Sequence, residues 1–309
     1  MQADRGRRTA MPRTTTPHPD GPLAGRYVLL DQVGAGAMGS VWRARDLRTG
    51  QVVAAKVLRA HDSTTLLRFV REQSVRIAHP HVVAPTGWAA EDHRVVFAMD
   101  LVRGGSVEQL LAEHGPLPAS YVALLLDQTL QALAAVHAAG VVHRDVKPGN
   151  LLLEPTGSGR PFVRLGDFGV AVPVEDVRLT RVPGAVGTAG YMAPEQSTGA
   201  APDPRQDVYA AGVVAAELLT GRRGAAPDGP LGPLLAAMTS ADPDLRPPTA
   251  AAALERLHRI EVPHDRPWPH VPDRLPDPPE PPARWAELAI ACFLAAIVLC
   301  AVAGYLLLS

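Results

Sequence analysis

The 309-residue sequence has only two cysteines, Cys292 and Cys300, and both lie in one apolar run near its C-terminal end. Without cysteine elsewhere, the rest of the chain cannot form a disulfide framework or a cysteine-ligated zinc site, which fits a reducing compartment. The sequence also has no large excess of positive or negative charge, because its 30 Lys and Arg residues nearly balance its 31 Asp and Glu residues. Nucleic-acid-binding proteins usually present a basic face, so we expect no nucleic-acid partner.

Two further signals are absent. No apolar segment follows the paired arginines Arg7 and Arg8, which excludes a twin-arginine export signal. No Walker A pattern (G-x-x-x-x-G-K-[ST]) occurs, which excludes that type of phosphate-binding loop. Residues 1–22 hold Arg, Thr and Pro but almost no large apolar side chain. We expect them to form a disordered tail, because they cannot bury enough surface to offset chain entropy.

The pattern of apolar residues along the sequence changes near residue 103. Before it, short apolar runs predict strands at 26–34, 40–46, 51–58, 82–89 and 94–102, with a helix over 64–78. After it, longer periodic runs predict helices at 106–115, 119–140 and 206–221. A sheet-rich part at 23–102 and a helix-rich part at 103–260 predict an α+β fold of two lobes with a cleft between them.

Two segments of different composition follow. Residues 261–284 carry proline at a density that forbids a helix and predicts an extended, semi-rigid linker. Residues 285–308 contain an uncharged apolar run from Leu288 to Leu308, long enough for one transmembrane helix; a buried globular helix is the alternative. Only Ser309 lies beyond, so we expect a single-pass C-terminal anchor in the cell membrane, no external sensor domain, and a cytoplasmic domain before it.

A glycine-rich loop with the pattern G-x-G-x-x-G-x-V runs from Gly34 to Val41. Glycines let the backbone approach a phosphate closely and present N–H groups to it. A Rossmann loop opens a helix, whereas this one joins two predicted strands. The context therefore favours a flap that covers phosphates, with a plain glycine-rich turn as the alternative.

Lys56 ends the third predicted strand, a short distance beyond the glycine loop. A lysine under such a loop can neutralise nucleotide phosphates when a carboxylate holds it in place. Glu72, in the predicted helix over 64–78, is the candidate partner. The alternatives are a solvated lysine and an ordinary surface glutamate.

The most informative run is HRDVKPGN at residues 143–150, followed by the tripeptide D-F-G at residues 167–169. An aspartate that accepts a hydroxyl proton and a lysine beside the transferred phosphate suit phosphoryl transfer, as do an asparagine and an aspartate that bind Mg²⁺. We therefore predict Asp145 and Lys147 as catalytic residues, and Asn150 and Asp167 as metal ligands. D-F-G alone is common as a simple turn, but both motifs in this order behind a glycine loop and a lysine are very rare by chance.

With these motifs in this order, the region from Leu23 to Ile260 resembles a eukaryotic-type (Hanks-type) serine/threonine protein kinase of the membrane-bound kind found in bacteria. The resemblance implies a kinase domain at 23–260 with the bilobal fold, using ATP and Mg²⁺, with Mn²⁺ as a substitute. Lys147 stands where tyrosine kinases usually have Ala or Arg, which indicates transfer to Ser and Thr hydroxyls. The partners implied are ATP, protein substrates, membrane lipid and a homodimer for trans-autophosphorylation.

The resemblance also assigns the nucleotide pocket. Met99 corresponds to the gatekeeper, and residues 100–102 correspond to the hinge that faces adenine. The nucleotide-contacting residues that we expect, including those already named, are Val33, Gly34, Ala35, Gly36, Ala37, Met38, Gly39, Val41, Ala54, Lys56, Glu72, Met99, Asp100, Val102, Asn150, Leu152 and Asp167.

Further roles implied by the resemblance concern the C-terminal lobe. Thr188, in the segment GTAGYMAPE at 187–195, would bond the catalytic aspartate during substrate docking. Asp207 and Gly212 would lie on the helix that braces the catalytic loop. Arg246 would pair with Glu195 in a structural role. The stretch between residues 220 and 242 is shorter than the family norm, and because that region often shapes the docking of protein substrates, we expect unusual substrate choice.

Residues 170–192 correspond to the activation loop, with Thr180 where related bacterial kinases are autophosphorylated. A phosphate there would pair with Arg144 and order the loop, whereas an unmodified threonine is the alternative. The rival to an enzyme is a pseudokinase that serves as a membrane-tethered, nucleotide-binding scaffold. Small-molecule kinases with this fold are a third class, disfavoured because they generally lack the A-P-E segment.

Overall fold

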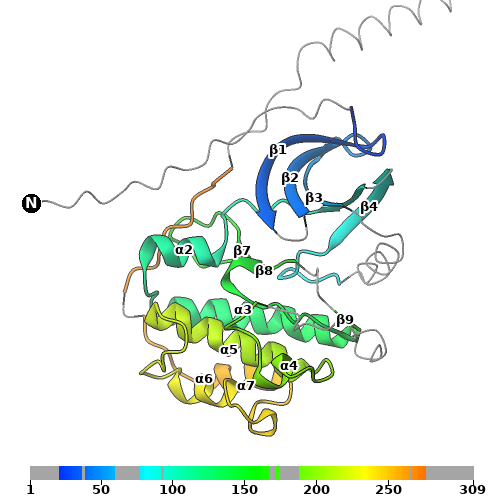
Figure 1. The fold of residues 1–309 in the computed structure, drawn as a ribbon. Helices are drawn as coiled ribbons and strands as arrows, with labels where there is room; N and C mark the ends of the chain where they lie inside the picture. The colour runs from blue at the N-terminus through cyan, green and yellow to red at the C-terminus, as the bar shows by residue number, and fades with distance from the viewer. Residues whose placement is uncertain are drawn as a thin grey trace, which may run out of the picture. The chain divides into compact units, whose positions relative to one another are not determined.

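The computed structural model describes residues 21–36, 39–59, 77–91, 94–167, 172–173, 188–264 and 266–275. The chain divides into two compact units, Met1–Pro276 and Asp277–Ser309, and only the first contains described residues. Within it a sheet-rich lobe stands against a larger helical lobe (Figure 1), as the sequence predicts. The predicted membrane segment 285–308 lies outside the described residues, as does nearly all of the predicted helix over 64–78 and of the tail at 1–22.

The N-terminal lobe is one five-stranded antiparallel sheet in the order β1-β2-β3-β5-β4. One face carries a cluster of buried apolar side chains, including Tyr27, Ala44 and Val96, because alternate residues of a strand point to the same side. All five predicted strands are confirmed, with ends shifted by a few residues. The strands are β1 (Tyr27–Gly36), β2 (Gly39–Asp46), β3 (Val52–Arg59), β4 (Pro85–Glu91) and β5 (Arg94–Met99).

The C-terminal lobe is built around a long apolar helix, α3, against which α5 and α7 pack. By length and composition α3 could cross a membrane, but 61% of its apolar 18-residue window is buried inside the protein, as expected for a core helix. Among the described residues no other helix passes that test. The helices are α2 (Val107–His114), α3 (Ala119–Ala138), α4 (Pro194–Ser197), α5 (Pro204–Thr220), α6 (Gly232–Met238) and α7 (Ala250–His258).

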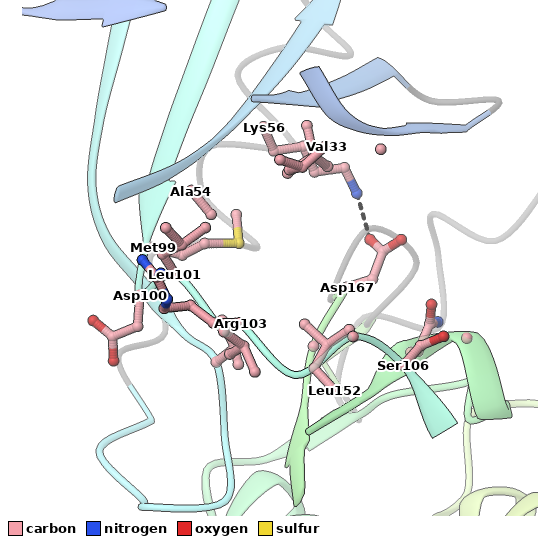
Figure 2. Close-up of a pocket in the computed structure, with 18 of the residues that line it drawn as sticks. Val33, Ala54, Lys56, Met99, Asp100, Leu101, Arg103, Ser106, Leu152 and Asp167 are labelled. Carbon is pink, nitrogen blue, oxygen red and sulfur yellow. Dashed lines mark hydrogen bonds and ion pairs between the residues drawn. The ribbon is translucent and has the colours of Figure 1, made fainter. Parts of the chain in front are cut away.

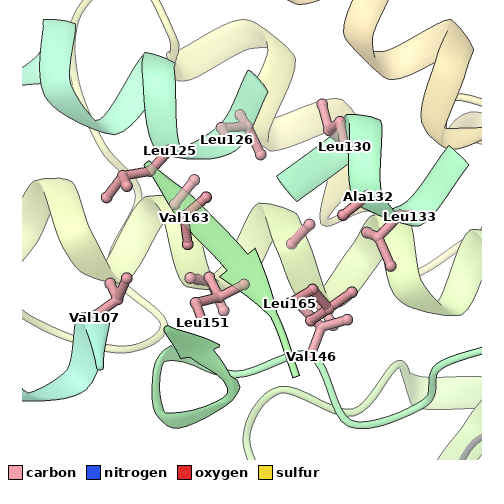
Figure 3. Close-up of a cluster of buried hydrophobic side chains, with 14 of the residues drawn as sticks. Val107, Leu125, Leu126, Leu130, Ala132, Leu133, Val146, Leu151, Val163 and Leu165 are labelled. Carbon is pink, nitrogen blue, oxygen red and sulfur yellow. The ribbon is translucent and has the colours of Figure 1, made fainter. Parts of the chain in front are cut away.

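Short strands join the helical core to the interlobe region. They pair as β6 with β9 and β7 with β8. Leucines of α3 and apolar side chains of β7 and β8 belong to one buried cluster (Figure 3). The strands are β6 (Val141–Val142), β7 (Leu151–Leu153), β8 (Val163–Leu165) and β9 (Val172–Pro173).

Local signals fix the helix ends. Ser106 caps α2 in a capping box with Gln109, and Gly115 closes the same helix. The C-cap of α3 is Ala139, and Gly140 follows it with φ of 74°, the usual place of a glycine that closes a helix. Gly212 lets α5 approach α6, because a Cβ there would lie 2.8 Å from the Met238 Cβ.

The segment after α7, predicted as an extended, semi-rigid linker, is docked on the helical lobe. Residues 262–264 and 266–275, called the strap below, form no helix and run back along the helical lobe (Figure 1, orange trace). Val271 is only 1% exposed, and it exchanges two backbone hydrogen bonds with Gly157. Proline excludes a helix here, as predicted, yet the chain remains docked on the lobe at least as far as Leu275.

Candidate functional site

A cavity of about 620 Å³ lies between the two lobes. In Figure 2, Val33 and Ala54 lie on its N-lobe side and Leu152 on its C-lobe side, while Lys56 and Asp167 meet at one end. Two apolar walls a short distance apart, with charged groups at one end, suit a flat ring that carries an anionic tail.

Most of the predicted nucleotide-contacting residues line this one cavity. Ala35 and Gly39 lie in the β1–β2 hairpin but not on the cavity wall, and Gly36 is the last residue of β1. Ala37, Met38 and Glu72 lie outside the described residues. The predicted residues on the wall are Val33, Gly34, Val41, Ala54, Lys56, Met99, Asp100, Val102, Asn150, Leu152 and Asp167.

The glycine loop connects β1 to β2, as predicted, and the ladder extends to the pair Gly36–Gly39. Gly39 has φ of 148°, and a Cβ at this position would lie 2.3 Å from the carbonyl oxygen of Val57 on β3. Only glycine allows the hairpin to lie so close to the neighbouring strand.

Lys56 forms an ion pair with Asp167, so a cation on β3 meets a carboxylate that follows β8 (Figure 2). The lysine side chain is 13% exposed and the aspartate side chain 43% exposed. Asp167 has φ of 61°, a left-handed conformation that non-glycine residues adopt mainly where surrounding structure imposes it, often at functional sites. The predicted Lys56–Glu72 pair stays untested because Glu72 lies outside the described residues.

Asp145 is the centre of a polar network beside the cavity. Its Oδ1 accepts a hydrogen bond of 2.7 Å from the Thr188 hydroxyl, as predicted. Its Oδ2 accepts hydrogen bonds from Lys147 Nζ at 2.7 Å and from Asn150 Nδ2 at 3.0 Å. Lys147 also donates to the Thr188 hydroxyl, at 2.8 Å. A carboxylate, an ammonium group and a hydroxyl therefore converge within hydrogen-bonding distance.

The backbone of residues 143–150, the predicted catalytic loop, is anchored by Asp207 of α5. Asp207 is fully buried and accepts hydrogen bonds of 2.8 Å each from the backbone N–H of His143, the backbone N–H of Arg144, and His137 Nε2. Burial alone would raise the pKa of Asp207, but the hydrogen bond from His137 and those from the backbone lower it below its ordinary value.

His143 connects the catalytic loop to the segment that carries Asp167. It is completely buried, and burial lowers the pKa of its ring, so the neutral form is favoured. Nε2 donates to the carbonyl of Gly166 at 3.1 Å, and Nδ1 accepts from the backbone N–H of Asp145 at 3.3 Å. The two carboxylates of the site are thus positioned by one shared side chain.

At the hinge, the backbone rather than a charged side chain faces the cavity. The Asp100 carboxylate points away from it (Figure 2) and pairs with Arg164 Nη2 at 2.7 Å. The cavity edge at residues 100–102 can therefore offer peptide N–H and C=O groups to a ligand.

The predicted Arg246–Glu195 pair is present below the site. The buried guanidinium of Arg246 donates twice to Glu195, at 2.7 and 2.8 Å, and stacks over the Tyr209 ring at 4.8 Å. A bidentate pair of this kind fixes direction as well as distance. It holds the start of α4, a few residues after Thr188, against α5.

Arg144 has an unusual environment. It is 7% exposed, and its Nε and Nη1 atoms have no hydrogen-bond partner among the described residues. Burial lowers the pKa of its guanidinium. Its φ of 67° lies in the left-handed region. A buried cation with free donors is a natural site for an anion.

Several cavity residues were not predicted. Val83 and Phe97 contribute apolar wall, and because β5 is a continuous apolar run with four consecutive buried residues, no alternation in its sequence indicates Phe97. No sequence pattern near Arg274 and Leu275 indicates that they line the cavity, because they reach it through the docked strap. Leu101, in the predicted hinge, also lines the cavity, and the remaining unpredicted lining residues are Pro85, Arg103, Gly105, Ser106, Gln109, Gly149 and Gly166.

The oxygen donors fit a hard cation that retains other ligands. Asn150 uses its amide nitrogen to donate to Asp145, which leaves its amide oxygen for a cation, and Asp167 offers a half-exposed carboxylate. No group of three or more His, Cys, Asp or Glu side chains forms a metal cage in the described part of the chain. Mg²⁺ is usually bound in this way, through one or two carboxylates together with substrate phosphates and water.

A family model described as the protein kinase domain matches residues 27–227. The chain is 42% identical to serine/threonine-protein kinase PkaA of Streptomyces coelicolor over 217 residues, covering 65% of this chain and 40% of that protein. It is 39% identical to serine/threonine-protein kinase PknA of Mycobacterium tuberculosis over 219 residues, covering 68% of this chain and 50% of that protein. The matched region thus spans half or less of each of these relatives.

Proposed function

The chain belongs to the protein kinase family, and from this premise we propose that it transfers the γ-phosphoryl group of ATP to Ser and Thr hydroxyls of proteins. The carrying observation is the convergence of Lys147, Asn150 and the Thr188 hydroxyl on Asp145, beside a cavity whose end is closed by the Lys56–Asp167 pair. Phosphoryl transfer depends mostly on such positioning and on charge neutralisation.

In this proposal the adenine ring lies between the apolar walls of Ala54 and Leu152 and bonds to the hinge backbone. Lys56 neutralises the phosphates beneath the glycine loop. Mg²⁺, bound by Asp167 and Asn150, would supply charge neutralisation at the phosphates, and Mn²⁺ has the same preference for oxygen ligands.

Asp145 orients the acceptor hydroxyl and takes its proton. Its Oδ1 already accepts a hydrogen bond from a threonine hydroxyl, which supports this role. Lys147 lies 2.7 Å from the same carboxylate and would stabilise the charge that develops on the transferred group. The Thr188 contact supports a role of that residue in docking the substrate segment.

Activation by phosphorylation is part of the proposal. Thr180 is the candidate site, and it lies outside the described residues. We propose that the phosphate on Thr180 would bind the guanidinium of Arg144. Two buried donor atoms of Arg144 have no partner among the described residues, which supports this role. A phosphate carries nearly two negative charges, so it would form charge-assisted hydrogen bonds with this guanidinium. Autophosphorylation in trans, through a homodimer, is the route we propose.

We also propose that residues 285–308 anchor the kinase in the cell membrane, with the catalytic domain on the cytoplasmic side. The support is the uncharged run from Leu288 to Leu308, since a helix of that length satisfies every backbone group inside a bilayer. These residues lie outside those that the structure describes.

The Asp145→Asn substitution tests the proposed function. We expect the full chain to transfer ³²P from [γ-³²P]ATP to a generic protein substrate, and the variant to lose about 100-fold or more of that rate. ATP affinity should stay within about twofold, because Asp145 is not on the cavity wall. A wild-type chain that binds ATP but transfers no phosphate would instead indicate the scaffold alternative.

A further inference from the structure

The strap reaches the hinge after packing along the helical lobe. The Trp268 ring meets Tyr121 of α3 edge-on, with centroids 5.9 Å apart, and its Nε1 donates to Ser120 Oγ at 3.1 Å. Four prolines, at positions 263, 267, 269 and 272, restrict the backbone of the strap. Because proline reduces the freedom that the unbound chain would have, docking costs less entropy than it would for a flexible tail.

At the hinge, Arg274 makes most of the contact. Its backbone N–H donates to the carbonyl of Arg103 at 2.8 Å, and its Nε donates to the carbonyl of Gly104 at 2.9 Å. Its two Nη atoms donate to the two carboxylate oxygens of Glu113 on α2, at 2.7 and 2.6 Å. One side chain thus joins the chain leaving the hinge to the first helix of the C-terminal lobe.

A second arginine makes the reverse connection. Arg103, just after the hinge, pairs with Asp273 of the strap at 2.8 Å and donates to the carbonyl of Leu275 at 2.9 Å. Each segment therefore supplies one guanidinium that binds a backbone carbonyl of the other. Reciprocal charge-assisted contacts of this kind fix register as well as affinity.

The backbone around the hinge leaves space for this arrangement. A Cβ at Gly104 would lie 2.8 Å from Val271 Cγ1, and a Cβ at Gly105 would lie 2.6 Å from Arg274 Cδ. The strap therefore lies against the backbone itself. Arg274 and Leu275 also line the same cavity as Lys56 and Asp167.

We propose that the strap is a working part of the nucleotide site, forming the outer wall of the pocket at the hinge exit, with Arg274 as the positioning residue that holds the hinge for ATP. The inference rests on the proposed function in one respect, that the nucleotide is ATP. It extends the catalytic domain past the predicted boundary at residue 260 to at least Leu275.

Two substitutions in the full-length protein test this role. We expect Arg274→Ala to raise the KM for ATP and the Kd for ADP by about three- to tenfold, the range for a lost coupling between charged partners. The kcat at saturating ATP should stay within about twofold, because the contacts of Arg274 described above are with the hinge backbone and Glu113 and not with the groups around Asp145. Arg274→Lys keeps the charge without the bidentate fork and should give a smaller rise.

The pairing partner and a matched control complete the test. Glu113→Gln should raise the same constants, and combining it with Arg274→Ala should add less than the sum of the two effects, because the residues act together. Arg256→Ala, at an exposed arginine on α7, should leave both constants unchanged. If Arg274→Ala fails to fold, as judged by its thermal melt, Arg274→Lys and Glu113→Gln decide the matter.

The strap proposal is overturned if the KM for ATP and the Kd for ADP stay within twofold of wild type in every folded Arg274 and Glu113 variant. It is also overturned if kcat falls while both constants are unchanged. A wild-type protein that binds nucleotide but transfers no phosphate contradicts only the proposed function, and the ADP measurement then decides on the strap. A wild-type protein that binds no nucleotide overturns both.

Discussion

Replacing Asp207 with asparagine tests how the fold holds the catalytic loop. Asp207 Oδ1 accepts the backbone N–H of Arg144, and Oδ2 accepts the backbone N–H of His143 and His137 Nε2. Asparagine has the same shape, but its amide nitrogen cannot accept a hydrogen bond. In either orientation of the amide, one buried backbone N–H of the loop then faces another donor.

The expected loss of unfolding free energy follows from the number of buried donors that lose their acceptor. A buried donor that loses its acceptor costs about 1–3 kcal/mol, and hydrogen bonds to a charged acceptor lie at the strong end. We therefore expect Asp207→Asn to lower the free energy of unfolding by about 2–4 kcal/mol. Asp207→Ala removes all three acceptor contacts and should cost at least as much, about 3–5 kcal/mol.

The same residue predicts part of the acid sensitivity. Because the pKa of Asp207 is below its ordinary value of 3.8 in the folded state, the folded protein binds this proton less readily than the unfolded chain. Its stabilising contribution is therefore complete above pH 3.8 and is lost as the pH falls below that value. The difference in unfolding free energy between wild type and Asp207→Asn should shrink in that acid range.

Urea unfolding of the full chain, followed by tryptophan fluorescence, measures these differences, and kcat measured beside it reports on the loop. Asp228→Asn, at an exposed position, is the matched control and should change stability by less than about 0.5 kcal/mol. We expect kcat to fall with Asp207→Asn, because His143 and Arg144 directly precede Asp145. A change in unfolding free energy no larger than the control's would refute the reasoning.

Two predictions concern regions outside the described residues. Mass spectrometry of the active enzyme after incubation with ATP and Mg²⁺ should find phosphate on Thr180, and the Thr180→Ala variant should activate more slowly. An active enzyme that is unmodified at Thr180 would contradict this proposal. Fractionation of cells should place the full chain in the membrane pellet and a chain ending at Arg284 in the supernatant, whereas a soluble full chain would contradict the anchor.

Local sequence patterns predicted most of the fold and much of the site. Short apolar runs located the strands of the N-terminal lobe. The loop around Asp145 could be predicted because its chemistry is compressed into residues 143–150. The contacts expected for Thr188 and for Arg246 are both present.

The docking of the strap is a part of the fold that local sequence patterns do not predict. Its prolines predict an extended chain correctly, but composition does not say whether such a chain is free or docked. Docking depends on Trp268 meeting Tyr121 and on Arg274 meeting Glu113, contacts between residues more than 140 positions apart. The ion pair of Lys56 with Asp167 has the same origin, since it exists only because the two lobes face each other across the cavity.

The most direct test of the central claim is phosphoamino-acid analysis of a generic protein substrate labelled by the full-length wild-type chain with [γ-³²P]ATP and Mg²⁺. The account predicts label on phosphoserine and phosphothreonine, and its loss with Asp145→Asn. Absence of label from the wild-type reaction, label confined to phosphotyrosine, or equal labelling by Asp145→Asn would contradict it.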